Sequence, residues 1–456
     1  MFAAYGYNLT ETETVSDSLG PGSFEASEPV GWESHAFALL LLVVVGAPGL
    51  ILIGMDQMFV GTLLVSIPFL VIGLTRPFIG LCYLTALAPL DFFVGLGEGA
   101  ASLSKVLAVQ IAVGWGLSLL RSNRIFWCRE FTFLTAFVVW AGLSCSWSIL
   151  PSVSWRVTLG SLLLVAMTFM FVNLVDSLAH LRVLMAYAAI SCSILAAVLI
   201  LKPAHVETVR ATVGAFSPNE IAVSLSFGFV VTVYLLTRAR NWFLKLLLVV
   251  MTLGLLGAVA TTQSRGLLLT IAAMAILGPL ITFRKHLLRA FGSLIFTVAL
   301  LSVFGFIAFR MGLLDRVIEA GTKDSGRLYI WRTALAATEG NRLLGIGYGT
   351  FRLTTGHMTS HNLYVQFLVE LGIPGVLLWL TFAVLVLARV SRFQATRDRF
   401  FGVIMWCQVF VPDLVMSAFT MKTMWMGIAI LLTMGKLMKR SPARSQEYVG
   451  LPLESV

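Results

Sequence analysis

The sequence predicts an all-α polytopic membrane protein with about 12 to 14 transmembrane helices. The 456-residue chain is 58% hydrophobic and only 12% charged, and its mean hydropathy is +0.91. Soluble domains carry about twice that share of charged residues. Continuous apolar runs, close to the length that crosses a bilayer as a helix, recur along the chain. A β-barrel would instead require alternating apolar and polar residues.

Fourteen such runs can be delimited, and they are the expected transmembrane helices. In order, they lie at 36–55, 58–75, 77–96, 102–120, 131–149, 155–175, 182–201, 219–237, 242–262, 266–283, 288–310, 373–388, 401–417 and 421–437. Prolines 48, 68, 77 and 89 fall in or beside the early runs. Because proline breaks a helix interior, two of these runs can fail to span, which gives the predicted range.

Basic residues concentrate in the loops on one side of the alternating spans, which is therefore expected to be cytoplasmic. These loops lie at 121–129, 238–240, 284–289, 389–399 and 436–444. Fourteen spans then place both termini in the cytoplasm. Residues 1–34 contain six acidic residues and neither Lys nor Arg, which predicts a disordered cytoplasmic tail. Residues 438–456 are expected to form a second, short tail.

The net charge of +10 is explained by these basic loops, so nucleic-acid binding is not expected. The five cysteines are scattered and lack the spacing of a metal site. We interpret them as core residues. The sequence also lacks a dinucleotide-binding fingerprint, a Walker motif and an HExxH motif. Neither a metal nor another cofactor is therefore expected.

One long polar segment, residues 311–372, separates the predicted membrane regions 35–310 and 373–437. It falls on the extracytoplasmic side, although seven Lys and Arg residues lie in the stretch from 310 to 352. Long loops are not governed by the positive-inside rule, so these cations need another role. The same orientation places Arg210 and Arg265 on the outer side. Arginines gathered there would suit an anionic ligand, such as a phosphate group at the bilayer surface.

Within this segment, residues 327–339 are expected to form a short helix, capped by Asp324 or Ser325 and ended by residues 340–341. Its predicted apolar face carries Leu328, Trp331 and Leu335. A glycine-rich turn follows at 345–349. Its backbone amides are weak candidates for phosphate binding.

His361 is the strongest candidate for a reactive group. Asn362 can cap the helix that follows, so the imidazole would lie at a helix start on the outer face. A neutral imidazole in that place can act as a general base toward a hydroxyl group. The alternative is an ordinary surface histidine or a partner for Glu370. His357, four residues earlier, is a second polar candidate.

The outer arginines have two interpretations. Arg265 and Arg327, with support from Arg210 and Arg332, would bind a diphosphate. Alternatively, they snorkel or form ordinary ion pairs at the membrane interface.

Two polar groups next to or inside predicted spans also need interpretation. Asn219 and Glu220 either line the same cavity as the arginines or cap a helix. Asp413 is interpreted mainly as a residue that hydrogen-bonds to a neighbouring helix. The alternative is a role as a proton relay.

The stretch from His361 to Gly375 resembles the signature of the bacterial O-antigen ligase/polymerase family, in which His-Asn is followed by an E-x-G and a further apolar span. In this chain the signature contains His361-Asn362 and Glu370-Leu371-Gly372. Three other stretches resemble family motifs in the expected order: 210–219, Ser264-Arg265-Gly266, and Ser325-Gly326-Arg327 with Trp331. The resemblance covers about residues 210–379. Thr359 stands where some members carry a second histidine.

The resemblance implies a metal-independent glycosyltransferase with a GT-C-like helical fold, in the bacterial inner membrane and with its active loop in the periplasm. The donor would be a glycan linked to undecaprenyl pyrophosphate. His361 would activate the acceptor hydroxyl, and Arg265, Arg327 and Arg210 would bind the pyrophosphate. The supporting residues would be Arg332, His357, Asn362 and Glu370. Its partners would be membrane lipid and the chain-length regulator and flippase of the same pathway.

Polymerisation of O-antigen or exopolysaccharide repeat units is the preferred prediction. The alternative is ligation, in which the glycan is transferred to the lipid A–core of lipopolysaccharide. A further alternative is a transporter of lipid-linked glycan, which would need paired charges within the membrane and an inverted repeat. A structural partner in a polysaccharide assembly complex would tolerate loss of His361, Arg265 and Arg327.

Overall fold

The computed structural model describes residues 57–90, 103–122, 125–201, 204–206, 210–212, 217–310, 326–356, 360–438 and 448–449, with four single positions before residue 57. The predicted N-terminal tail, almost all of the first predicted span and most of the C-terminal tail lie outside these ranges. So do three of the singled-out residues: His357, Asp324 and Ser325.

Helices dominate the described part of the chain. The α-helices are α3 (Met58–Thr75), α4 (Pro77–Leu87), α5 (Leu103–Ser122), α6 (Arg129–Leu143), α7 (Pro151–Leu174), α8 (Leu178–Leu201), α9 (Pro218–Arg238), α10 (Trp242–Thr261), α11 (Arg265–Thr282), α12 (Leu287–Arg310), α14 (Arg327–Ala337), α15 (Phe351–Thr355), α16 (Leu363–Val390), α17 (Thr396–Phe410) and α18 (Lys422–Met438). The 3-10 helices are η2 (Ala88–Leu90), η3 (Ser144–Ser146), η4 (Glu339–Asn341) and η5 (Pro412–Leu414). Two small antiparallel strand pairs are β1 (Ile125–Phe126) with β4 (Tyr448–Val449), and β2 (Ala204–Val206) with β3 (Arg210–Thr212).

Five described helices are long and apolar enough to cross a membrane: α7, α8, α9, α10 and α16. Shorter apolar helices lie at 77–90, 107–119, 266–282 and 287–299. From 58–75 onward, every predicted span overlaps one observed α-helix. The all-α polytopic fold class is therefore confirmed. The end of the helices near residues 326–362 is called the outer end below, following the predicted orientation, and the opposite end the inner end.

The largest difference from the predicted spans is at α16, which begins at Leu363 and not at residue 373. Gln366 and Glu370 made its first turns look like a loop, yet both side chains are hydrogen-bonded inside the protein. The helix is kinked at Gly372, whose φ of 66° and ψ of −166° are not helical. The polar turns before the kink are thus a separate segment at the outer end of the helix.

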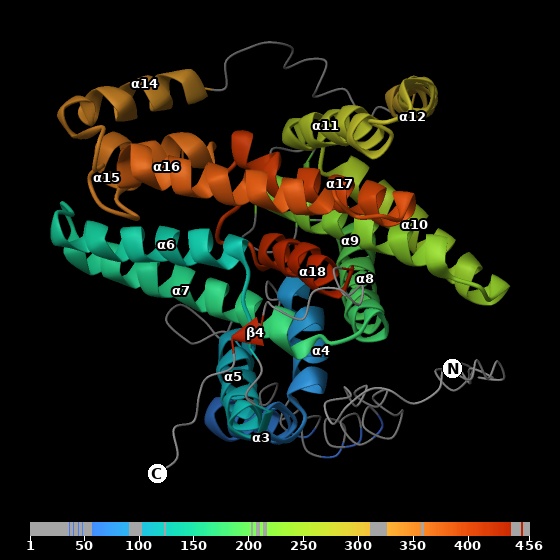
Figure 1. Ribbon diagram of the computed structural model, residues 1–456, viewed down its shortest axis with the longest axis horizontal. Coiled ribbons are helices and arrows are strands. Elements are labelled where there is room, and N and C mark those ends of the chain that lie inside the picture. The colour runs from blue at the N-terminus through green and yellow to red at the C-terminus, as the bar shows by residue number, and fades with distance from the viewer. Residues whose placement is uncertain are drawn as a thin grey trace.

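The helices pack in neighbouring groups (Figure 1). Helix α6 lies along α16, α11 along α17, and α7 along α18, while α8, α9 and α10 contact one another. Aromatic rings fill the centre: Trp379 is fully buried, and its ring centroid lies 5.2 Å from that of Phe419 and 5.7 Å from that of Phe137. This densely packed centre lies next to the outer part of α16 and supports it.

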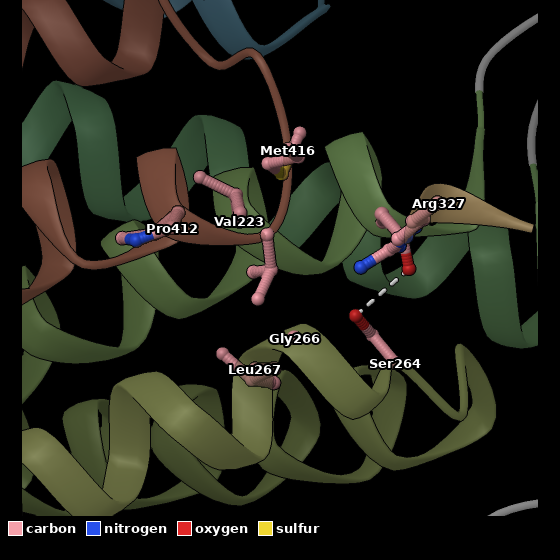
Figure 2. Close-up of a pocket in the computed structure, with 9 residues that line it drawn as sticks. Val223, Ser264, Gly266, Leu267, Arg327, Pro412 and Met416 are labelled. Atoms are coloured by element: carbon pink, nitrogen blue, oxygen red, sulfur yellow. Dashed lines mark hydrogen bonds between the residues drawn. The ribbon is translucent and has the colours of Figure 1, made fainter. Parts of the chain in front are cut away.

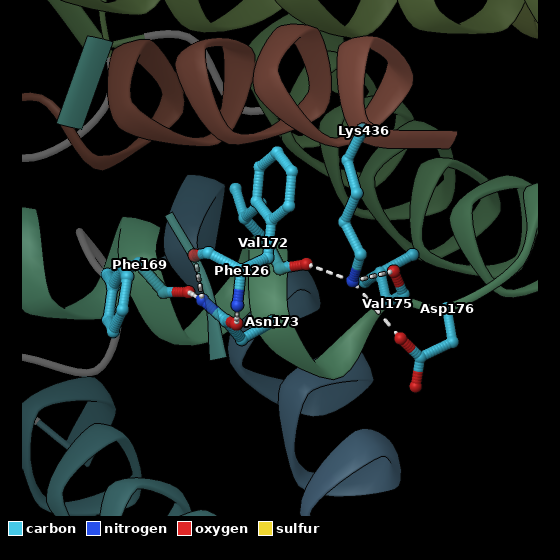
Figure 3. A network of polar contacts seen from close by, with 7 residues as sticks. All are labelled: Phe126, Phe169, Val172, Asn173, Val175, Asp176 and Lys436. Atoms are coloured by element: carbon cyan, nitrogen blue, oxygen red, sulfur yellow. Dashed lines mark hydrogen bonds and ion pairs between the residues drawn. The ribbon is translucent and has the colours of Figure 1, made fainter. Parts of the chain in front are cut away.

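Two ion pairs join the inner ends of the helices, and the first is buried on both sides. Arg389 of α16 donates two hydrogen bonds, of 2.6 and 2.7 Å, to the carboxylate of Glu130 in α6. Lys436 of α18 donates to the backbone carbonyls of Val172 and Val175 at the end of α7, and its Nζ lies 3.1 Å from Asp176 Oδ1 (Figure 3). Cations suit these positions because the last carbonyl groups of a helix lack partners within the helix.

Candidate functional site

The polar motifs of the outer end meet at residues 411–417, which begin the connection between α17 and α18. Its short helix η5 contacts both α11 and α16. The approach to α11 is close, because a Cβ atom added to Gly266 would lie 2.7 Å from Val415 Cγ2. This connection therefore brings the start of α11 and the start of α16 together.

A small, partly open pocket lies beside this connection. Its lining residues are Asn219, Val223, Ser264, Gly266, Leu267, Arg327, Pro412, Val415 and Met416. Figure 2 shows Arg327 and Ser264 on one side of the pocket, and Val223, Leu267 and Pro412 on the other. Ser264 Oγ donates a hydrogen bond of 2.9 Å to Asn219 Oδ1, which is the dashed line in the figure. The pocket thus has a polar side and an apolar side.

The predicted phosphate-binding arginines are distributed around this pocket. Arg327 lines it directly. Arg265 is the first residue of α11, and both of its neighbours in the chain, Ser264 and Gly266, line the pocket. Arg210 lies in β3, which contacts α9, the helix that contributes Asn219. The structure therefore places the backbones of all three arginines at the outer end, on elements that border or adjoin one pocket.

The start of α9 resolves the two interpretations of its polar residues. Asn219 lines the pocket. Glu220 forms a capping box with Ser217: the Glu220 amide donates to Ser217 Oγ at 3.3 Å, and the Ser217 amide donates to Glu220 Oε2 at 3.0 Å. Asn219 thus borders the pocket, and Glu220 is a helix cap.

His361 is exposed and has a left-handed backbone, with φ of 52°. Both of its neighbours are held by side-chain hydrogen bonds. The Ser360 carbonyl accepts a bond of 2.7 Å from Trp331 Nε1, and Asn362 Nδ2 donates a bond of 3.1 Å to the Leu414 carbonyl. A non-glycine residue in this conformation persists only where its surroundings fix it. The structure therefore presents the His361 side chain from a restrained turn next to residues 411–417.

Asn362 confirms its predicted role as a helix cap. Its Oδ1 accepts a hydrogen bond of 3.0 Å from the Val365 amide in the first turn of α16. Through its Nδ2 bond to Leu414, the same side chain also joins α16 to the connection that borders the pocket.

The short helix predicted at 327–339 is α14, but its cap and its apolar face differ from expectation. The position before its first residue is Gly326, with φ of 77°. The buried residues are Ile330 and Ala334, which pack with Trp331 and Leu335, whereas the Leu328 side chain is 49% exposed. The prediction was wrong for Leu328, because the face of α14 that packs on loop residues and on α16 is rotated away from this side chain.

Two of the predicted supporting residues lie away from the pocket lining. Arg332 is exposed on the outer surface of α14. Glu370 is 1% exposed, and its Oε1 accepts hydrogen bonds of 3.0 Å from the Phe351 amide and 3.3 Å from Gln366 Nε2. Glu370 thus anchors the loop segment at 351 to α16.

The glycine-rich turn at 345–349 packs the loop onto the helices. The Gly345 amide donates to the Asn341 carbonyl at 2.7 Å, and the Gly347 amide donates to the Glu370 carbonyl at 2.9 Å. A Cβ atom at Gly345 would lie 2.4 Å from the Glu370 carbonyl oxygen. The suggestion that these amides bind phosphate was wrong, because they are used inside the protein.

Tyr348, within the same turn, fixes the turn to α7 and to the 3-10 helix η3. Its hydroxyl group lies 2.9 Å from Ser161 Oγ, and its amide donates to Ser144 Oγ at 3.1 Å. Burial raises the pKa of the Tyr348 phenol above its ordinary value, so the group stays neutral. This anchor is structural.

Sequence reasoning missed the connection 411–417 as an organiser of the site. The available signal was Pro412, which ends α17, together with polar residues inside an apparently apolar run. Asp413 lies in η5 and is fully buried, and neither of its carboxylate oxygens has a hydrogen-bond partner among the residues that the structure describes. The Trp379 side chain of α16 and the Ala418 amide are the groups that act on its carboxylate.

The fold and the site define a polytopic helical membrane protein with an arginine-bearing pocket next to a restrained histidine at one end of its helices. Residues 250–380 match the family model described as O-antigen ligase. The matched stretch contains Arg265, Arg327 and His361 and makes up less than a third of the chain. No curated protein matches the chain. The family match confirms the resemblance on residues 250–380, and it supports glycosyl transfer of the O-antigen ligase/polymerase type in general.

Proposed function

We propose that this protein is a metal-independent glycosyltransferase that moves a glycan from undecaprenyl pyrophosphate to an acceptor hydroxyl group at the periplasmic face of the inner membrane. Its preferred reaction is the polymerisation of O-antigen or exopolysaccharide repeat units. One observation carries the proposal: the pocket bordered by Arg327 and by both neighbours of Arg265 is also bordered by residues 411–417, to which Asn362 holds the turn of His361.

The pocket suits a donor that is part anion and part lipid. Guanidinium groups bind phosphate oxygens through charge-assisted, often bidentate hydrogen bonds. The opposite side, with Val223, Leu267 and Pro412, is apolar and suits the isoprenoid part of the donor. A polyprenyl pyrophosphate contains both parts in one molecule.

In the proposed reaction, the imidazole of His361 accepts the proton of the acceptor hydroxyl as its oxygen attacks the anomeric carbon. A new glycosidic bond forms while the bond between that carbon and the pyrophosphate oxygen breaks. The electron pair leaves with undecaprenyl pyrophosphate. Arg265 and Arg327, with Arg210 in support, stabilise the charge that develops on this leaving group.

Ligation to lipid A–core uses the same chemistry with another acceptor, so it remains the alternative. The transporter alternative would need paired charges along a path through the membrane. The described ion pairs Arg389–Glu130 and Lys436–Asp176 instead lie at the inner ends of helices, at the far end of α16 and α18 from the His361 turn. This placement favours an enzyme with a site at one face.

The test uses purified protein in detergent with an undecaprenyl-pyrophosphate-linked repeat unit from its own host, analysed on a glycan gel. A ladder without added core, absent with His361→Ala, supports polymerisation. A single new band that requires lipid A–core supports ligation. The absence of product in both reactions, with a native donor and folded protein, would refute the proposed enzyme activity.

Two control variants match the test substitutions. His286 is an exposed histidine between α11 and α12 at the inner end, so His286→Ala should leave the product unchanged. Arg342 is an exposed arginine of the outer loop whose side chain lies 3.8 Å from Glu339 in a solvent-exposed pair. Arg342→Ala therefore tests whether the loss of any outer arginine reduces activity, as opposed to the loss of Arg327.

A further inference from the structure

A chain of polar side chains runs from the buried carboxylate of Glu370 to the residue that precedes His361. Gln366 Nε2 donates to Glu370 Oε1 at 3.3 Å, and Ser417 Oγ donates to Gln366 Oε1 at 2.7 Å. The hydroxyl groups of Ser417 and Ser360 are 3.3 Å apart. Three separate parts of the chain, the start of α16, the connection 411–417 and the loop turn, are joined in this way.

The chemistry of these groups fixes the direction of the chain. Glu370 Oε1 accepts the hydrogen bond of the Phe351 amide, so the NH₂ group of Gln366 faces this oxygen as a second donor. The carbonyl oxygen of Gln366 is then turned toward Ser417, whose hydroxyl must donate. The lone pairs of Ser417 consequently face Ser360. Glu370 itself is oriented by the Phe351 amide at 3.0 Å.

The Ser360 end of this chain controls the backbone of His361. Ser360 is fully buried, and its Oγ accepts a hydrogen bond of 3.1 Å from the Asn362 amide. Because the Ser417 proton is donated to Gln366, the single proton of Ser360 is shared between the Asn362 carbonyl and Ser417 Oγ. Two of these contacts join Ser360 Oγ to Asn362, so they bridge the residue between them, His361. They close the turn in which the φ of His361 is 52°. The orientation of the Ser360 hydroxyl is therefore linked to the unusual backbone of His361.

We infer that Gln366 and Ser417 are positioning residues for His361. They transmit the fixed orientation of the buried Glu370 carboxylate to the Ser360 turn and so hold the imidazole in place for the acceptor hydroxyl. Neither side chain lines the pocket next to Arg327. The inference rests on the proposed function, in which His361 is the general base.

This role predicts a separation of kinetic constants. Displacing a catalytic group by about 1 Å reduces the rate of the chemical step about 100-fold, whereas donor binding by the arginines is kept. Gln366→Leu and Ser417→Ala should each lower kcat by about 10- to 100-fold and change the KM for the donor less than about threefold. Ser417→Thr keeps the hydroxyl and should recover most of the activity.

The experiment measures steady-state kinetics of the purified full-length protein with the polyprenyl-pyrophosphate-linked repeat unit. The double variant Gln366→Leu/Ser417→Ala should be about as active as the worse single variant, because both changes break one chain. Ser391 bonds a backbone carbonyl at the inner end of the same helix, so Ser391→Ala is the matched control and should be unchanged. Thermal unfolding of each variant shows whether it is folded.

The outcomes separate this inference from the proposed function. If the wild-type protein transfers glycan, His361→Ala is inactive, and Gln366→Leu and Ser417→Ala are as active as wild type, the positioning role is refuted and the function stands. An equal loss with Ser417→Thr and Ser417→Ala, or a loss confined to KM, also refutes it. If the wild-type protein transfers no glycan at all, the proposed function itself fails.

Discussion

The indole nitrogen of Trp331 and the carbonyl oxygen of Ser360 lie 2.7 Å apart, so the short loop helix α14 is bonded directly to the residue before His361. One turn earlier on the same helix, Arg327 lines the pocket. A single rigid element therefore places the arginine and restrains the histidine turn. This relationship explains why a polar loop can hold two groups of one site in register although the chain between them is long.

Replacement of Trp331 by phenylalanine should reduce activity about 10-fold while the protein stays folded. Phenylalanine keeps most of the packing against the loop and removes only the N–H donor, which leaves the buried Ser360 carbonyl without this partner. Turnover of lipid-linked donor and thermal unfolding measure the two effects. Trp242→Phe, at a tryptophan that is 74% exposed at the inner end of α10, should change neither. Full activity of Trp331→Phe would show that the hydrogen bond does not hold the turn.

Substitution of Arg327 should act mainly on donor binding. Arg327→Ala should lower kcat/KM by about 100-fold, with a clear rise in KM for the pyrophosphate-linked donor. Arg327→Lys should recover only part of this loss, because an ammonium group cannot bind two phosphate oxygens in the planar geometry of arginine. Steady-state kinetics with Arg342→Ala as the control check this. An unchanged KM together with an unchanged kcat would remove Arg327 from the site.

Replacement of Gly345 by alanine should destabilise the protein by at least about 2 kcal/mol and reduce activity with it. Its φ is 72°, and the added Cβ would meet the backbone of Glu370 at 2.4 Å. Gly326→Ala separates the two causes, because Gly326 has φ of 77° but open space around it, so only about 1 kcal/mol of backbone strain is expected. Gly340→Ala, with neither feature, should be neutral. Denaturant unfolding compares all three, and equal stability of Gly345→Ala and Gly340→Ala would contradict the packing role.

The sequence predicted the membrane helices well because their signal is local. Each apolar run of bilayer length specifies a helix by itself, and the spans from residue 58 onward overlap observed helices. The start of α16 was placed ten residues too late, because Gln366 and Glu370 have partners supplied by distant parts of the chain. A hydropathy profile uses only neighbouring residues, so it contains no information about such partners.

The site was predicted in its residue types but not in its organisation. Motif order and the outer orientation pointed to Arg327 and His361, and the Asn362 cap was predicted from its place in the sequence. The role of the connection 411–417 depends on contacts among α11, α16 and η5, far apart in the chain. The glycine-rich turn looked like a phosphate loop because its packing partners are not adjacent in sequence.

Arg389 and Glu130 form a bidentate, buried ion pair. Removing one of the two charges should destabilise the protein more than removing both. Their side chains are 7% and 5% exposed, so Arg389→Met leaves a buried carboxylate without its cation and should destabilise the protein by about 3 to 5 kcal/mol. The double variant Arg389→Met/Glu130→Met removes both charges and should recover much of that stability, because an apolar pair of similar volume is often neutral. Denaturant unfolding of the three proteins measures the coupling.

Since the pair lies at the opposite end of α16 from Asn362, the folded double variant should keep the kcat of the wild-type protein. A double variant no more stable than Arg389→Met would show that Arg389 acts through contacts other than Glu130, such as its close packing against Gly435.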